Sequence, residues 1–109
     1  MQSSYDVFIS YAREDQEFMR YLKDLFIEAG LSVWTDDSMT YGNPSWQQDV
    51  ERAITSSTCM VVIMSPDAKS SKWVEIEFTT AVGQDIRVIP LLYKGNERTS
   101  VPIGLKAMN

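Results

Sequence analysis

The stretch "CMVVIMSPDAKSSKWVEIEFTTAVG", residues 59–83, decides the fold class, because it joins a buried strand to a helix through a short loop. Its first part, Cys59–Ser65, is the most apolar run of the chain and predicts a central strand. "PDAKSS" follows as a predicted loop, and a helix is expected from Lys72 to about Val82, with Gly83 ending it. A buried strand followed by a helix is the repeating unit of parallel sheets.

The rest of the chain repeats this unit. Three further β-rich runs, each too short for a helix, predict strands: Tyr5–Tyr11, Leu31–Thr35 and Ile86–Tyr93. The spacing of apolar residues predicts helices over residues 12–29 and from about Trp46 to Ile54. Strands that alternate with helices predict an α/β fold, with one doubly wound parallel sheet and helices on both faces. Pro90 indicates that the last strand lies at an edge or contains a bulge.

The composition restricts the partners. The 109 residues allow a single domain, and 15 acidic against 10 basic side chains give a net charge of −5. Nucleic acid and anionic membranes are not expected as partners, because phosphate binding needs clustered positive charge. No segment has the length of a membrane span or the pattern of a leader sequence, so we expect a cytoplasmic protein.

The chain has no histidine, and Cys59 is its only cysteine. A disulfide within the chain is excluded, as are zinc sites built from histidine and cysteine and every catalytic triad with a histidine base. Since Cys59 lies inside an apolar run, we interpret it as a core residue and not as a nucleophile. No metal site is expected, and acid–base chemistry would depend on Asp, Glu, Lys or Tyr.

Two glutamates of the predicted helix after Ser71 are candidate chemical groups. On a helical wheel Glu75 and Glu77 flank the apolar face at similar angles, so burial alone does not choose between them. Trp73 lies one turn before Glu77, near the strand ends where ligands bind in such folds. The indole favours Glu77, although the same pattern is also typical of a tryptophan that caps the core beside a solvated glutamate.

Other acidic residues support weaker alternatives. Asp36 and Asp37 follow a predicted strand and would suit a metal or a ribose, but aspartate at such a junction is more often a turn former. Asp67 and Lys94 would suit a phospho-receiver domain, although their offset from the strand ends is poor. The sequence has no glycine-rich phosphate loop and no G-x-S-x-G turn.

Three ordered motifs, "YDVFISYA", "GLSVWTDD" and "VVIMSPDAKSSKWVEIEF", resemble the Toll/interleukin-1 receptor (TIR) domain, especially its bacterial branch. The resemblance extends from Tyr5 to about Leu105 and implies a flavodoxin-like sheet in one TIR domain over residues 1–109. In the family a further strand and helix follow the element that corresponds to Pro102–Leu105, so we expect a fragment of a longer protein. Val74 stands where the family often has cysteine, a difference that concerns packing.

The resemblance also implies an activity. Enzymatic TIR domains cleave the nicotinamide–ribose bond of NAD+ and release nicotinamide with ADP-ribose or a cyclic form of it. Glu77 corresponds to their catalytic glutamate, and Trp73, four residues earlier, corresponds to an aromatic substrate-binding position. NAD+ would be the substrate, and no cofactor is implied.

Further substrate-binding residues are implied at matching positions. Tyr11, Ala12 and Arg13 correspond to a segment that lines the NAD+ pocket, where Arg13 would meet the pyrophosphate. Trp46 corresponds to an aromatic wall of the pocket or to a core contact of its helix.

The loop Asp36–Ser45 corresponds to the segment through which TIR domains self-associate, and Asp36 and Ser38 lie where it closes over the ligand. Self-association would switch the enzyme on in signalling, immunity or antiphage defence. Two alternatives stay open: a non-enzymatic adaptor that only makes homotypic contacts, and a related enzyme that processes free nucleosides.

Overall fold

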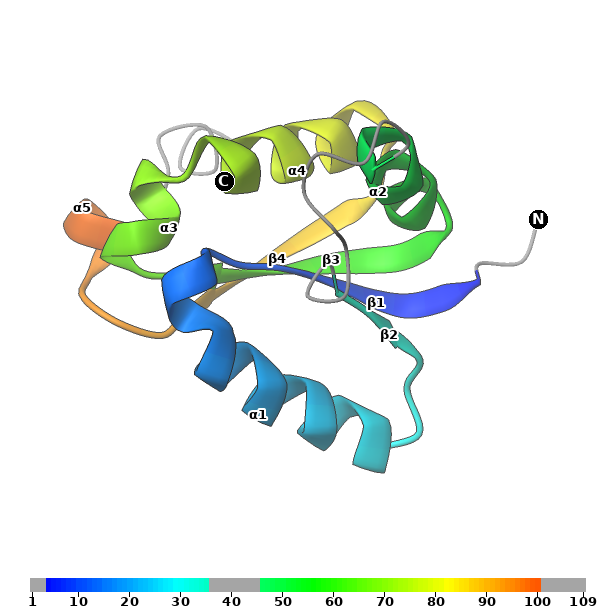
Figure 1. The fold of residues 1–109 in the computed structure, drawn as a ribbon, viewed down its shortest axis with the longest axis horizontal. Coiled ribbons are helices and arrows are strands. Elements are labelled where there is room, and N and C mark those ends of the chain that lie inside the picture. The colour runs from blue at the N-terminus through cyan, green and yellow to red at the C-terminus, as the bar shows by residue number, and fades with distance from the viewer. Residues whose placement is uncertain (1–3, 36–45, 101–109) are drawn as a thin grey trace.

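The computed structural model describes residues 4–35 and 46–100, without the side chains of Trp46, Gln47 and Glu97. In this part of the chain one sheet is formed in the order β2-β1-β3-β4, and every pairing is parallel (Figure 1). The strands are β1 (Tyr5–Ser10), β2 (Val33–Trp34), β3 (Ser57–Met64) and β4 (Arg87–Leu92).

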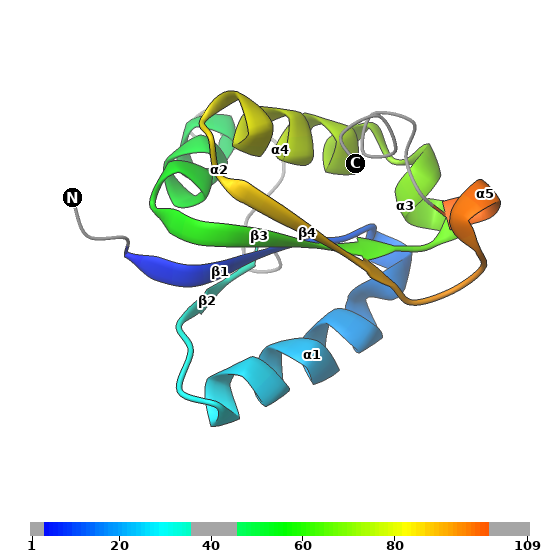
Figure 2. The ribbon, with the colours of Figure 1, turned by 180° about the vertical axis from the view of Figure 1, so that it is seen from behind.

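Helices cover both faces of the sheet. They are α1 (Gln16–Glu28), α2 (Trp46–Thr55), α3 (Pro66–Ser70), α4 (Lys72–Gly83) and α5 (Glu97–Ser100), and a 3₁₀ turn, η1 (Arg13–Asp15), precedes α1. Figures 1 and 2 show α1 on one face and α2 with α4 on the other. This arrangement confirms the predicted doubly wound α/β fold.

The central strand β1 divides the apolar core into two clusters. Successive side chains of a strand point to opposite faces of the sheet. Phe8 therefore packs with residues of α2 and α4, whereas Val7 and Ile9 pack with Met19 and Leu22 of α1. Because both faces of the sheet are covered, β1 and β3 are almost continuously apolar, as is typical of parallel sheets.

The short helix α3 is the clearest difference from the sequence-based expectation, since its segment was predicted to be a loop. Ser65 caps this helix: its Oγ accepts a hydrogen bond from the backbone N–H of Ala68 at 3.0 Å. Pro66 occupies the first helical position, where its missing N–H has no helical partner to lose. The loop prediction was wrong because a single helical turn has the same residue preferences as a loop.

Two other segments differ in extent. The strand predicted over Leu31–Thr35 contains only Val33–Trp34, and the tail, for which no element was predicted, contains α5. Pro90 lies exposed in β4 at the edge of the described sheet, as predicted. Among the helices of residues 4–35 and 46–100, none is long and apolar enough to cross a lipid bilayer.

Candidate active site

A pocket of about 260 Å³ lies beyond the carboxyl end of β1, and we call it the Trp73 pocket. Tyr11, Ala12 and Arg13, which follow β1, line one part of it, and Asp67 of α3 and Trp73 of α4 line another. In open α/β sheets the carboxyl ends of the strands are where ligands bind. The structure thus brings together four of the predicted substrate-binding residues, Tyr11, Ala12, Arg13 and Trp73, from two segments far apart in the chain.

Glu77 lies one helical turn after Trp73 and is bonded to Ser10, the residue before Tyr11, but it is not among the described residues that line the pocket. Only 1% of its surface is exposed, and its Oε1 accepts a hydrogen bond of 2.7 Å from Ser10 Oγ. Ser10 itself is completely buried. A carboxyl group held inside the protein by a serine hydroxyl is not a solvated surface glutamate, so the bland interpretation of Glu77 is wrong.

Local geometry explains why these two side chains meet. Alternation along β1 places Ser10 on the same face of the sheet as Phe8, which is the face that α4 covers. In α4, Glu77 belongs to the buried side of the helix together with Val74, whereas Glu75 is exposed. The helical wheel left the two glutamates equivalent, and the tertiary structure separates them.

A second buried pair joins a residue next to the pocket-lining Glu14 to the cap of α3. Asp15, which is 3% exposed, accepts a hydrogen bond from Ser65 Oγ through its Oδ2. Ser65 is the residue that caps α3, so its hydroxyl group serves both as donor and as acceptor. Sequence reasoning missed this pair, because its two members are 50 residues apart and give no local signal.

The two buried pairs have opposite arrangements of hydroxyl and carboxyl groups. The hydroxyl group of Ser10, at the end of β1, is bonded to the carboxyl group of Glu77, and the carboxyl group of Asp15, five residues later, is bonded to the hydroxyl group of Ser65. The pocket-lining residues 11–14 lie between the two attachment points. Both ends of this wall are therefore tied to the α3–α4 segment by buried hydrogen bonds, which are stronger than equivalent bonds in water.

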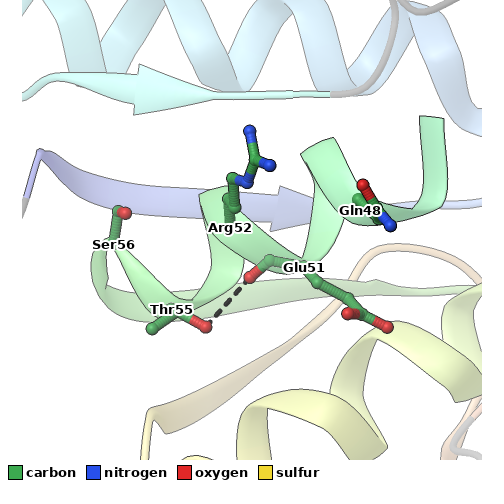
Figure 3. A pocket seen from close by; sticks show the side chains of 5 residues that line it. All are labelled: Gln48, Glu51, Arg52, Thr55 and Ser56. Atoms are coloured by element: carbon green, nitrogen blue, oxygen red, sulfur yellow. Dashed lines mark hydrogen bonds between the residues drawn. The ribbon is translucent and has the colours of Figure 1, made fainter. Parts of the chain in front are cut away.

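A larger hollow of about 510 Å³ lies beside α2 and has a different character (Figure 3). Its lining comes from one helix and the turn after it: Gln48, Glu51, Arg52, Thr55 and Ser56. Thr55 Oγ1 donates to the carbonyl of Glu51 at 3.0 Å within that helix, and no described residue of the lining is buried. Polar groups that are exposed to water stabilise a developing charge only weakly. The smaller Trp73 pocket is therefore the better candidate for the active site.

Cys59 is half-buried in β3, and burial raises the pKa of its thiol group above the ordinary value of 9.0. The positive charge of Arg87 opposes this shift, and the negative charge of Asp6 adds to it. A raised pKa leaves little nucleophilic thiolate near neutral pH. In the described part of the chain no group of acidic, cysteine or histidine side chains is arranged to hold a metal ion.

Three predicted substrate-binding residues lie outside what the structure describes. Asp36 and Ser38 fall in residues 36–45, and of Trp46 only the backbone, at the first position of α2, is described. The loop Asp36–Ser45, predicted to mediate self-association, falls there as well.

Comparison with known proteins agrees with this architecture. A family model described as the TIR domain matches residues 7–109. The chain is 32% identical over 96 residues to a probable 2' cyclic ADP-D-ribose synthase, TcpO, of Methanobrevibacter olleyae, covering 84% of this chain and 28% of TcpO. It is 28% identical over 98 residues to the 2' cyclic ADP-D-ribose synthase AbTIR of Acinetobacter baumannii, covering 85% of this chain and 36% of AbTIR. The chain thus spans about a third of the length of these curated relatives.

Solved structures show the same similarity. The TIR domain of the Toll-related receptor TRR-2 from Hydra magnipapillata superposes with a TM-score of 0.78 at 30% identity, over 97% of this chain and 82% of that one. The TIR domains of the activated Roq1 resistosome give a TM-score of 0.73 at 29% identity, over 88% of this chain and 61% of that one. With the family model matching nearly every residue and the sheet matching these structures, the chain belongs to the TIR domain family.

Proposed function

We propose that this chain is a TIR-type NAD+ glycohydrolase that cleaves the nicotinamide–ribose bond, with Glu77 as the catalytic residue. The observation that carries the proposal is the buried hydrogen bond between Glu77 and Ser10 next to the Trp73 pocket. Relatives named as 2' cyclic ADP-D-ribose synthases and as NAD(+) hydrolases, among them TirS of Staphylococcus aureus, support it.

The proposed reaction needs no histidine. The bond between the ribose C1 atom and the ring nitrogen of nicotinamide breaks, and nicotinamide leaves with the bonding electrons as a neutral molecule. Positive charge then develops on the ribose, as in other glycosidic cleavages, and a nearby carboxylate stabilises it. If the oxygen of a water molecule then bonds to the ribose C1 atom, the product is ADP-ribose. If a hydroxyl group of the substrate itself bonds there, the product is cyclic. A proton is released in either case.

Each residue of the site has a role in this proposal. Glu77 would face the developing charge and hold a ribose hydroxyl group, and Trp73 would form a flat wall against the substrate. Arg13 is exposed at the pocket and would meet the pyrophosphate, for which a guanidinium group is well suited. Asp36, Ser38 and Trp46 stay proposed contacts from the resemblance.

Access to Glu77 links activity to assembly in this proposal. Because the side chain is 1% exposed in the single chain, the ribose reaches it only after a rearrangement around the pocket. We include self-association through the Asp36–Ser45 loop as the event that favours the accessible state, in a cytoplasmic signalling or defence response. NAD+ turnover would then rise more steeply than in proportion to protein concentration.

A single pair of variants tests the catalytic assignment. Glu77→Gln removes the charge but keeps the size of the side chain, whereas Glu75→Gln makes the same change on the exposed side of the same helix. Consumption of NAD+, or of a fluorescent analogue, is measured at high protein concentration with a clustering agent. We expect loss of at least about 100-fold for Glu77→Gln and little change for Glu75→Gln. Unchanged turnover in Glu77→Gln would refute the assignment.

A non-enzymatic interaction module is the second candidate. The large apolar side chains of Ile76 and Val82 are 46% and 42% exposed on α4. Exposed apolar side chains on one helix suit contacts between copies. A chain that assembles, as judged by light scattering, and leaves NAD+ intact would support this candidate against the enzyme.

A further inference from the structure

We infer that Ser10 is a positioning residue for Glu77, an inference that rests on the proposed function. Its Oγ donates the 2.7 Å hydrogen bond to Glu77 Oε1, and both side chains are out of contact with solvent. Ser10 is not among the described residues that line the Trp73 pocket. Since its hydroxyl group is completely buried and bonded to Glu77, its influence on the reaction would pass through the carboxyl group that it holds.

The geometry of a glutamate explains why such a partner matters. The last torsion of its side chain, which turns the plane of the carboxyl group, has a broad energy minimum and is poorly fixed by rotamer preference. A hydrogen bond from a fixed donor selects one orientation of that plane. Displacements of about 1 Å at a reacting group reduce rates by about 100-fold, so fixing the orientation of the carboxyl group is expected to increase the rate of bond cleavage.

The donor is fixed because of its place in the sheet. Ser10 is the last residue of β1, which pairs with β2 on one side and with β3 on the other. In the β3 pairing Ser10 lies opposite Val62, another fully buried residue. A hydroxyl group on a central strand is a more precise attachment point than one on a loop.

A purely structural role would leave a different signature. Ser10 would then satisfy a buried carboxyl group and contribute to stability alone. Ser57 provides the matched comparison: it is 2% exposed, and its Oγ donates a bond of 2.7 Å to the carbonyl of Ala53. Ser57 begins β3 opposite Tyr5, at the other end of the strands from Ser10.

The experiment compares Ser10→Ala with Ser57→Ala in the clustered NAD+ assay. For Ser10→Ala we expect a fall in kcat of about 10- to 100-fold with KM changed less than threefold or so, since a misaligned carboxylate still lies in an intact pocket. Ser57→Ala should keep the kcat of the unmodified chain. Added to Glu77→Gln, Ser10→Ala should reduce the residual turnover no further, because its effect passes through the carboxylate.

The possible results separate the inference from the proposed function. Unchanged kcat in a folded Ser10→Ala variant overturns the positioning role. Turnover by the double variant that falls below that of Glu77→Gln alone also overturns it. In both cases the proposed NAD+ glycohydrolase activity of the unmodified chain is unaffected. Absence of NAD+ loss from the unmodified chain overturns the proposed function itself. If Ser10→Ala does not fold, Ser10→Cys keeps the size of the side chain with a weak donor, and a lowered kcat in that variant supports the inference whereas full kcat contradicts it.

Discussion

Asp15 and Ser65, which are 50 positions apart in the sequence, share a buried hydrogen bond that ties the turn after β1 to the cap of α3. The bond joins the fifth residue after the central strand β1 to the first residue after the central strand β3. Removing either partner would therefore release α3 from the wall of the Trp73 pocket as well as leave a buried polar atom unsatisfied.

We predict that Asp15→Ala lowers the free energy of unfolding by about 2–3 kcal/mol, because a buried hydrogen bond to a carboxyl group is lost with its acceptor. Asp15→Asn keeps an oxygen that accepts from Ser65 and should cost about half as much. Urea unfolding followed by circular dichroism gives both values. Equal losses for the two substitutions would contradict the importance of this bond.

The stack of Phe18 on Tyr93 provides a second prediction. Their ring centroids are 3.9 Å apart at an interplanar angle of 9°, which joins α1 to the residue after β4. Phe18→Ala should destabilise the protein by about 2 kcal/mol through lost stacking and buried area. Tyr21→Ala is the control, since Tyr21 is 61% exposed and only tilted against Phe18, and should cost less than about 0.5 kcal/mol.

The thiol group of Cys59 should make stability depend on pH in alkaline solution. Burial raises the pKa of Cys59 in the folded state above 9.0, so the folded protein binds this proton more tightly than the unfolded chain. The stabilising contribution is complete below pH 9 or so and is lost as the pH rises through the folded-state pKa. Urea unfolding between pH 8 and about 11 should show this loss, and Cys59→Ala should reduce it.

The rate of alkylation by iodoacetamide is an independent measure of the thiolate fraction of Cys59. Because Arg87 lowers the pKa of Cys59, Arg87→Leu should slow alkylation at pH 8 or so relative to the unmodified chain. Faster alkylation in this variant would mean that access, and not charge, controls the thiol.

Two glycines with positive φ differ in what surrounds them. Gly30, at φ 90°, has no atom within 4 Å of an added Cβ, whereas Gly95, at φ 80°, would direct that Cβ against the hydroxyl groups of Thr99 and Ser100. Gly30→Ala should cost about 1 kcal/mol from backbone strain alone. Gly95→Ala should cost more, and thermal unfolding of the two variants measures the difference.

The strands and both faces of the sheet could be predicted because apolar runs carry that information directly. The burial of β1 and β3 on two faces follows from their composition, and Pro90 indicated an edge strand. The extent of β2 could not be predicted, since pairing with β1 limits it to Val33–Trp34.

The site was predictable only in part. Tyr11 and Trp73 could be placed together from the rule that ligands bind at strand ends, because this rule depends on topology alone. Trp73 already favoured Glu77 over Glu75, but the burial of Glu77 against Ser10 could not be predicted, because Ser10 is 67 residues from Glu77 and gives no local signal. Pairing of polar groups between distant segments is a tertiary property, and a helical wheel does not contain it.

The alternation of side chains along β1 has a consequence for errors in folding. A slip of this strand by a single residue against β3 would turn Ser10 to the opposite face and present an apolar neighbour, Ile9 or Tyr11, to the carboxyl group of Glu77. A misregistered molecule would bury that acid among hydrocarbon side chains at high cost in free energy. The hydrogen bond between Ser10 and Glu77 thus favours the native register of β1 against β3.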